Sequence, residues 1–226
     1  MAGSIEQPNR GLISGRDFTF RPLARSDFPI LFSWLHNPAV QEWWDDPPAT
    51  IDEIEGKHVP RIDGSELVYG YIAEHLGVPM GYLQWYRLGT EPEHPAVGLV
   101  PEDAAAIDLF IGEDAYRRRG YGSVMIGAFL RNVVFNEPDV GSCAIDPCVG
   151  NRVAIAAYRK TGFRDIGIAA NPHENRDSQI MLIDRGNLSD SLVQSPTVNT
   201  ERPPGSFTHS VSQTNPQAPN TDQDQE

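Results

Sequence analysis

The sequence predicts an α/β (α+β) fold in which helices flank a central sheet, and three stretches of the chain support this prediction. Residues 106–163 alternate apolar runs with segments of helical spacing, in the order strand, glycine-rich turn, helix, strand and helix. Residues 68–87 contain two apolar runs separated by a glycine-containing turn, which is typical of a β-hairpin. Residues 163–184 contain two more apolar runs, which we expect to close the sheet.

In the N-terminal half, local signals set the limits of the elements. Ser26-Asp27 precede an apolar run with helical spacing, and Asn37-Pro38 end it, because proline disfavours helical geometry in the residue before it. Thr50 and Glu53 form a capping-box pattern at the start of the next helix. We expect strands or helices at residues 18–23, 28–35, 50–60, 68–74 and 80–87.

The C-terminal half begins with a long polar segment. Residues 88–105 are rich in Gly, Pro and Glu, and we expect them to form a long mobile loop near the functional site. A shorter polar segment, residues 171–177, joins the last two predicted strands. The strands and helices of this half are expected at residues 106–111, 123–136, 141–146, 151–161, 163–169 and 178–184.

Composition divides the chain into one folded domain and two flanking segments. Residues 1–15 are small and polar, so we expect a flexible N-terminus. Residues 187–226 consist mainly of Ser, Thr, Asn, Gln, Pro and acids, and cannot bury enough surface to offset an ordering cost of ~1–2 kcal/mol per residue. We therefore expect one domain at residues 16–186, followed by a disordered, acidic and polar tail.

Charge and cysteine content exclude several classes of protein. The 226 residues carry a formal net charge of −13, which disfavours nucleic acid and anionic membranes and favours cationic partners. The sequence has neither a long apolar run nor a basic, apolar N-terminus, so we expect no membrane span, no signal peptide and a cytoplasmic location. Two cysteines, Cys143 and Cys148, favour reduced thiols over a redox pair.

The histidines show no metal-ligand spacing, and we expect no metal. We interpret all of them as surface or loop residues: His36, His58, His75, His94, His173 and His209.

The glycine-rich turn in the middle of the chain has the character of an anion site. Arg117-Arg118-Arg119-Gly120-Tyr121-Gly122 stands where a helix begins, so free backbone N–H groups and the positive end of the helix dipole point at whatever lies there. The spacing fits neither a P-loop nor a G-x-G-x-x-G dinucleotide motif. We expect a pyrophosphate group to bind there.

Two motifs in this region resemble those of the GCN5-related N-acetyltransferases (GNAT). Arg117-x-x-Gly120-x-Gly122 resembles the acyl-CoA pyrophosphate loop of that family, and Asn151…Ala154-Ile155-x-x-Tyr158…Gly162-Phe163 resembles its second signature. The resemblance implies a central mixed, mostly antiparallel, twisted sheet of six to seven strands, with a splay between its two central parallel strands. It also implies acetyl-CoA as cosubstrate, bound by Leu109, Phe110, Ile111, Arg117, Arg118, Arg119, Gly120, Tyr121, Gly122, Ser123, Asn151 and Ala154.

Two residues are candidates for the catalytic roles in acetyl transfer. The leaving thiolate needs a proton, and the resemblance implies that Tyr158, a phenol of pKa ~10, donates it. Asp108 lies inside an apolar strand, where a carboxylate is costly unless something compensates it. In the family this strand runs beside the acetyl group, so Asp108 would face the amine as general base or as anchor. A packed tyrosine and a solvent-facing aspartate are the alternatives.

The acceptor side resembles the aminoglycoside 6'-N-acetyltransferases within the family, over roughly residues 18–186. The shared features include Glu42-Trp43-Trp44, Ile107-Asp108 and Asp146-Pro147. At least one of the adjacent tryptophans is expected to be partly exposed, where it can bind a polycation together with the neighbouring acids; a core tryptophan beside a solvated loop is the alternative. The implied substrate-binding residues are Trp43, Trp44, Asp45, Tyr82, Gln84, Asp108 and Asp146.

The resemblance leaves the acceptor and the assembly open. The basic 117–119 run and the loops 88–105 and 170–177 depart from the aminoglycoside pattern. A siderophore-precursor lysine, a polyamine, a protein N-terminus or another amine is therefore an alternative acceptor. A non-catalytic acyl-CoA-binding sensor is a second alternative, and the protein is expected to be a monomer or a homodimer.

Overall fold

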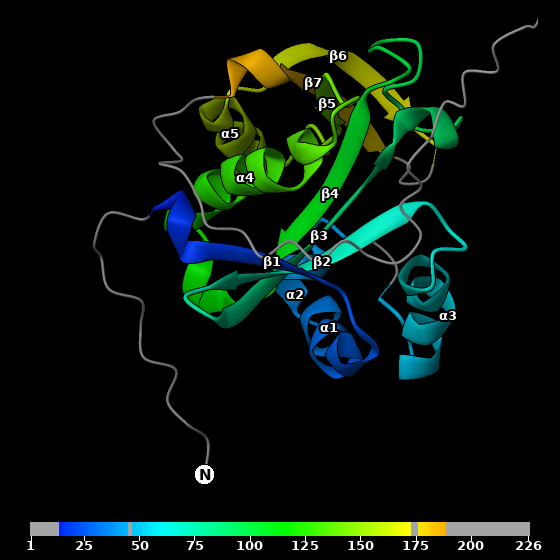
Figure 1. The fold of residues 1–226 in the computed structure, drawn as a ribbon, viewed down its shortest axis with the longest axis vertical. Coiled ribbons are helices and arrows are strands. Elements are labelled where there is room, and N and C mark those ends of the chain that lie inside the picture. The colour runs from blue at the N-terminus through cyan, green and yellow to red at the C-terminus, as the bar shows by residue number, and fades with distance from the viewer. Residues whose placement is uncertain (1–13, 45–46, 173–175, 189–226) are drawn as a thin grey trace, which may run out of the picture.

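A computed structural model describes residues 14–44, 47–172 and 176–188 of the protein, and within them a single seven-stranded sheet organises the fold (Figure 1). The strand order is β1-β2-β3-β4-β5-β7-β6. The strands are β1 (Phe18–Pro22), β2 (Val68–His75), β3 (Val78–Arg87), β4 (Ala105–Ile111), β5 (Ser142–Ile145), β6 (Arg164–Asn171) and β7 (Arg176–Asp184).

The sheet is antiparallel except at its centre, where β4 and β5 run parallel. These two strands pair only at Ala105 with Cys143 and at Ala106 with Ala144, after which they separate. Residues 107–111 of β4 therefore have no partner on β5, although β3 pairs with them along their whole length. We call this separation the splay. The predicted mixed, mostly antiparallel sheet with a splay between central parallel strands is confirmed.

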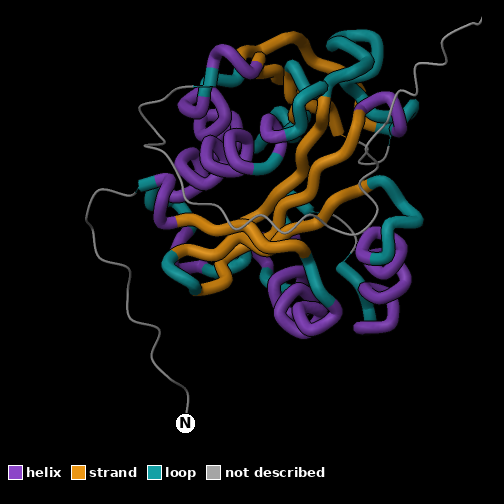
Figure 2. Tube along the Cα trace, viewed as in Figure 1, coloured by secondary structure: helices purple, strands orange, loops and turns teal. Residues whose placement is uncertain are grey.

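Helices cover both faces of the sheet (Figures 1 and 2). They are α1 (Phe28–Leu35), α2 (Pro38–Gln41), α3 (Ile51–Ile62), α4 (Tyr121–Asn132) and α5 (Arg152–Thr161). One core joins α4 and α5 to the sheet through residues such as Phe129, Ile155 and Ile107. A second core joins α1 and α3 to the opposite face through Leu31, Ile54 and other apolar side chains. The two helix pairs thus cover opposite faces of the sheet.

The helix starts agree with their sequence signals. The Thr50 side chain accepts a hydrogen bond from the Glu53 N–H at 3.3 Å, which satisfies one of the free donors of α3. Asn151 does the same for α5 by accepting from the Ala154 N–H at 3.1 Å. The end of α4 differs from the prediction, because the α-helix stops at Asn132 and residues 134–136 tighten into a 3-10 turn.

The segment between β3 and β4 is a packed loop rather than the mobile loop that its composition suggested. Ala96, Val100 and Ala104 are buried, and they form a third core with Tyr86 and Ile180 of the sheet. Turn hydrogen bonds run along the segment, including His94 N–H to the Glu91 carbonyl at 3.0 Å. The prediction was wrong here because the buried residues are small and are scattered among glycines, prolines and acids.

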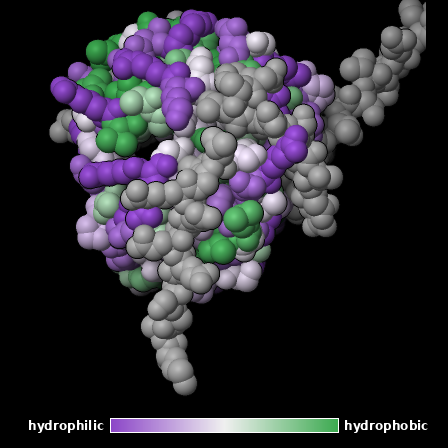
Figure 3. All heavy atoms as spheres, turned by 90° about the vertical axis from the view of Figure 1, so that its left-hand side faces the viewer, coloured by the Kyte–Doolittle hydropathy of each residue, from purple (hydrophilic) through white to green (hydrophobic). Residues whose placement is uncertain are grey.

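The expected flexible N-terminus and disordered tail lie almost wholly outside the described residues, so the domain limits stay predictions. Among the residues that the structure describes, no helix is both long and apolar enough to cross a membrane. On the face shown in Figure 3, hydrophilic side chains surround smaller apolar groups. The most exposed large apolar side chains of the described parts are Leu76, Ile168 and Val153.

Candidate active site

A cluster of polar side chains borders the splay. Asp108 lies on β4 two residues beyond the last pair with β5, and it pairs across the sheet with Gln84 of β3. Asp146 follows the last residue of β5, so it stands on the other side of the splay. We call Asp108, Asp146, Gln84, Tyr86 and His94 the carboxylate cluster.

Asp108 is partly buried and is held by two donors from β3. Gln84 Nε2 donates to Asp108 Oδ2 at 2.7 Å, and the Tyr86 hydroxyl also hydrogen-bonds to this carboxylate. On its other side, the Gln84 Oε1 atom accepts hydrogen bonds from Arg61 Nη1 at 2.8 Å and from the Tyr82 hydroxyl at 2.9 Å. The predicted site residues Tyr82, Gln84 and Asp108 thus form one connected network.

The surroundings of Asp108 favour its neutral form more than water does. Burial raises the pKa of Asp108 to about 6, and the negative charge of Asp146 acts in the same direction. The hydrogen bonds from Gln84 and Tyr86 and the charge of His94 work against this rise. A carboxylate with a pKa near 6 can accept a proton near neutral pH and release it again.

Asp146 faces His94, which comes from the packed loop between β3 and β4. His94 Nε2 lies 3.4 Å from Asp146 Oδ1, and both side chains are largely buried. The Ala96 N–H donates to His94 Nδ1 at 3.1 Å, so in the neutral imidazole the proton sits on Nε2 and faces Asp146. Burial alone would lower the pKa of His94, but Asp146, Asp108 and Glu91 together raise it.

The interpretation of the histidines as surface or loop residues was wrong for two of them, His58 and His75. His58 and His75 are buried on α3 and β2, and His94 belongs to the carboxylate cluster although it lies in a loop. His36 is exposed, as expected, whereas His173 and His209 lie outside the described residues. Aromatic rings surround the two buried histidines, which a search for metal-ligand spacing does not detect.

Tyr158 projects from α5 into the same electrostatic neighbourhood. Its ring is buried and packs edge to face on Phe163, with 5.8 Å between the ring centroids. Burial raises the pKa of Tyr158, and the charges of Asp108 and Asp146 raise it further. The phenol therefore keeps its proton at neutral pH and is available as a donor.

The glycine-rich turn leaves the start of α4 open. Gly120 is the N-cap residue with φ of +90°, and no side chain caps the helix there. The amides of Tyr121, Gly122 and Ser123 form the first turn, where intrahelical acceptors are lacking. Arg118, which has φ of +57°, and Arg119 are exposed beside it. This arrangement suits an anion.

Arg117 differs from the other two arginines because its side chain is engaged within the protein. Its Nη1 atom donates to the carbonyls of Ile111 and Gly112 at 3.1 Å each. Its Nη2 atom donates to Asn37 at 3.3 Å and forms an ion pair with Asp114. Arg117 thus supports the turn from inside, and its side chain ties the end of β4 to the start of α2.

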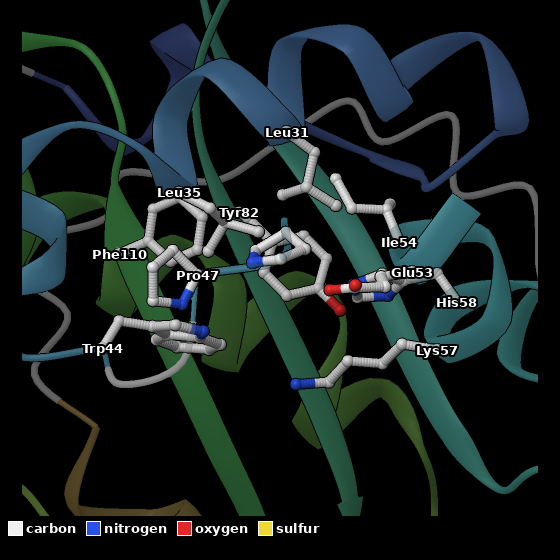
Figure 4. Close-up of a pocket in the computed structure, with 11 residues that line it drawn as sticks. Leu31, Leu35, Trp44, Pro47, Glu53, Ile54, Lys57, His58, Tyr82 and Phe110 are labelled. Atoms are coloured by element: carbon white, nitrogen blue, oxygen red, sulfur yellow. The ribbon is translucent and has the colours of Figure 1, made fainter. Parts of the chain in front are cut away.

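An aromatic cavity of about 300 Å³ lies between α1, α3 and the sheet (Figure 4). Its lining residues are Leu31, Leu35, Trp44, Pro47, Pro48, Glu53, Ile54, Lys57, His58, Tyr82 and Phe110. Burial lowers the pKa of His58 to about 3, with help from Arg61 and Lys57, so its imidazole is neutral. Tyr82 connects this cavity to Asp108, because its hydroxyl donates to Gln84.

The two adjacent tryptophans point in different directions. Trp44 lines the cavity and packs edge to face on Phe110, with 5.0 Å between the ring centroids. Trp43 lies beside the turn after β5, where a Cβ atom on Gly150 would sit 3.6 Å from its ring. Both are partly exposed. Asp45, the third predicted contact in this segment, lies outside the described residues.

Sequence reasoning missed Arg61, Tyr86, His94 and His58. Tyr86 could have been found, because it follows Gln84 by two residues on a strand and therefore faces the same side. The other three depend on how α3 and the packed loop dock on the sheet, which no local pattern shows. Both cysteines are free thiols, and the described residues contain no group of three side chains placed to hold a metal.

Comparisons with known proteins identify the family. A family model described as an acetyltransferase (GNAT) domain matches residues 24–170. The aminoglycoside N(6')-acetyltransferase type 1 of Klebsiella pneumoniae is 29% identical over 168 residues, which cover 70% of this chain and 80% of that protein. A protein of the same name from Serratia marcescens matches to the same extent.

Solved structures agree with the family match. The crystal structure of the aminoglycoside acetyltransferase AAC(6')-Ib with coenzyme A has a TM-score of 0.68 at 27% identity, over 75% of this chain and 96% of that one. Its complex with coenzyme A and kanamycin has a TM-score of 0.67 at the same identity and coverage. The family model covers well over half of the sequence. The chain therefore belongs to the GNAT family of acetyltransferases.

Proposed function

We propose that the protein transfers the acetyl group of acetyl-CoA to a primary amine, namely the 6'-amino group of an aminoglycoside. The observation that carries this proposal is the pair of carboxylates, Asp108 and Asp146, on the two sides of the splay. An amine that enters the carboxylate cluster as an ammonium ion is attracted by both. The reaction would take place in the cytoplasm, where acetyl-CoA is available.

The residues around the splay fit acetyl-CoA. The open start of α4 presents amides to the pyrophosphate, with Arg118 and Arg119 beside them. Residues 109–111 belong to the part of β4 that has no partner on β5, and they offer backbone groups to the pantetheine arm. In this proposal Asn151 and Ala154, at the start of α5, also contact the cofactor. Bound there, acetyl-CoA supplies a thioester as the acetyl donor.

The chain's own residues handle the protons. An amine must be uncharged to attack, and Asp108 can take its proton because the carboxylate is ionised above a pKa of about 6. Tyr158 holds a proton that it can donate to the sulfur of the leaving thiolate. Asp108 is the general base and Tyr158 the general acid in this assignment, while Asp146 anchors the ammonium form.

The acceptor pocket fits a polycation that carries a ring. The carboxylate cluster supplies negative charge, and the adjoining cavity supplies the aromatic faces of Trp44, Tyr82 and Phe110. His58 is neutral there, and the two charged lining residues, Glu53 and Lys57, are of opposite sign. Aminoglycosides combine amino groups with compact rings, and two similar AAC(6')-Ib structures are described as complexes with kanamycin and with ribostamycin.

A panel of amines tests the proposal. We expect kcat/KM with acetyl-CoA to be highest for aminoglycosides that carry a 6'-amino group, and to drop by orders of magnitude when a 6'-hydroxyl replaces it. The panel also contains spermidine and lysine derivatives. If one of these has a higher kcat/KM than the aminoglycosides, that amine is the substrate instead. No turnover with any amine would favour a non-catalytic acyl-CoA sensor.

A further inference from the structure

A continuous chain of hydrogen bonds leads from α3 to Asp108. Arg61 lies in the last turn of α3, where its guanidinium is largely buried and bonded to Glu66 at 3.0 Å. Its Nη1 atom donates to Gln84 Oε1 at 2.8 Å, and Gln84 Nε2 donates to Asp108 Oδ2 at 2.7 Å. Arg61 thus acts on the candidate base through one intervening side chain.

The partners of Gln84 differ in what they impose on its amide. A guanidinium can only donate, so the atom of Gln84 that faces Arg61 must be Oε1. The Tyr82 hydroxyl can donate or accept, and Asp108 can do either once it is protonated. Of these three partners, Arg61 alone excludes the flipped amide, in which Gln84 would turn its oxygen toward Asp108.

We propose that Arg61 is a positioning residue, which fixes the Gln84 amide so that an N–H group always faces Asp108. An N–H group favours the ionised carboxylate, whereas an amide oxygen in its place would require a protonated one. Arg61 therefore keeps Asp108 in the form that can accept a proton from the amine. This inference rests on the proposed function only for its link to catalysis, since the orientation itself follows from the hydrogen bonds.

A double-mutant cycle with a direct titration tests the proposal. The variants are Arg61→Met, Gln84→Met and the double variant, and the signal is the NMR shift of the Asp108 carboxyl carbon between pH 4 and 9. We expect Arg61→Met to make Asp108 about tenfold less acidic, a shift of one pH unit. Gln84→Met should have a similar effect, and the double variant should add nothing further.

The cycle separates orientation from charge. If Arg61 acts only as a nearby positive charge, its removal will shift the titration equally with and without Gln84, and the proposal is then overturned. An unchanged Asp108 titration in Arg61→Met also overturns it. Should Arg61→Met fail to fold, Arg61→Gln replaces it, because this variant removes the charge and keeps a polar side chain. Arg61→Lys keeps a group that can only donate, and it is expected to retain the wild-type titration of Asp108.

The pH dependence of kcat/KM provides a second test of the role of Arg61. In Arg61→Met, kcat/KM should fall about tenfold below pH 6 and recover at high pH, which a merely destabilised enzyme would not do. The matched control is Arg159→Met, which removes an exposed arginine paired with Asp165 at 2.7 Å and should leave the profile unchanged. If the wild type acetylates no amine, the proposed function fails, but the NMR cycle still decides the role of Arg61.

Discussion

At the scale of single residues, Asp108 combines two properties that rarely occur together. It lies inside an apolar strand, and it still accepts hydrogen bonds from two donors, because Gln84 and Tyr86 both reach it from β3. Without these donors, burial and the charge of Asp146 would drive the carboxyl further toward its neutral form. The neighbours therefore hold its pKa at a value where both protonation states are accessible.

Substitution of Asp108 should remove the base and leave the fold intact. We predict that Asp108→Asn lowers kcat by about 10²–10⁴-fold, the usual contribution of a general base, with acetyl-CoA binding nearly unchanged. In the wild type, kcat/KM should rise as pH increases through about 6, because Asp108 must be ionised to act. Steady-state kinetics and calorimetry measure both. Asp165→Asn, at an exposed position, is the control.

A loss of acetyl-CoA binding equal to the loss of kcat would contradict this role. So would an acid limb in the pH profile that persists unchanged in Asp108→Asn, because another group would then have to titrate.

We predict that His94 acts on binding of the acceptor through Asp146, besides its effect on the pKa of Asp108. When its imidazole is protonated, it competes with the substrate ammonium for Asp146, 3.4 Å away. We predict that KM for the amine rises as pH falls in the wild type, and that His94→Gln, which keeps an N–H donor but cannot become charged, reduces this rise by about tenfold. The measurement is KM against pH, with His36→Gln as the control at an exposed histidine.

The assignment of His94 fails if His94→Gln changes KM by the same factor at every pH. A pH-independent change is what the loss of simple packing would produce, since the loop around His94 is held by Ala96 and Val100 in the core.

At the scale of elements, the turn after β4 depends on a glycine for space rather than for backbone freedom. A Cβ atom at Gly112 would lie 2.2 Å from the ring of Trp34. Trp34 cannot move aside easily, because it is buried and its indole N–H donates to Glu113 at 2.8 Å. The close approach lets α1 pack directly on the end of β4, beside the splay.

Two glycine-to-alanine variants should therefore have opposite effects on stability. We predict that Gly112→Ala destabilises the fold by about 1–3 kcal/mol through overpacking against Trp34. Gly56→Ala, inside α3 and with no atom beyond the neighbouring helix backbone within 4 Å of the new Cβ, should stabilise it by about 0.5–1 kcal/mol. Urea unfolding of both variants gives the two values. A Gly112→Ala variant as stable as the wild type would show that the packing at Trp34 is looser than described, and a destabilising Gly56→Ala would contradict the open site on α3.

The elements also show where sequence reasoning succeeds. The predicted strands and helices agree with the structure to within a few residues, since apolar spacing and caps such as Thr50 and Asn151 are local. The fold class and the family follow from two motifs, at the starts of α4 and α5, with β5 between them. The loop that carries His94 was misjudged because its burial comes from contacts with β3 and β7, which are distant in sequence.

At the scale of the whole molecule, the two faces of the sheet carry different parts of the candidate site. The face covered by α4 and α5 carries Tyr158 and the open helix start, and the opposite face carries α3 and the aromatic cavity. Asp108 and Asp146 stand at the splay, where the two faces communicate. In the proposed function, a donor and an acceptor can therefore approach one point from opposite faces of the sheet.

An ionisable side chain, His58 of α3, is buried among the apolar side chains between this helix and the sheet. Its pKa is lowered to about 3 in the folded protein by burial and by Arg61 and Lys57, against ~6.5 for an unperturbed histidine. Above pH 6.5 the His58 imidazole is neutral in both the folded and the unfolded protein, so it does not change the free energy of unfolding. As the pH falls from 6.5 toward 3, the imidazole becomes protonated in the unfolded chain but stays neutral in the folded protein. The free energy of unfolding therefore decreases by up to ~1.4 kcal/mol per pH unit.

We therefore predict that His58→Phe makes the fold less sensitive to acid. A phenyl ring can occupy the space between Phe28 and Tyr82, and it cannot take up a proton in the unfolded state. Asp108 acts in the opposite direction between about pH 6 and 4, since its raised folded-state pKa lets the folded protein take up a proton first. Urea unfolding at pH 7 and pH 5 should show a smaller loss of stability in His58→Phe than in the wild type. His36→Phe is the control, and an equal loss in all three proteins would mean that the buried imidazole is not the acid-sensitive group.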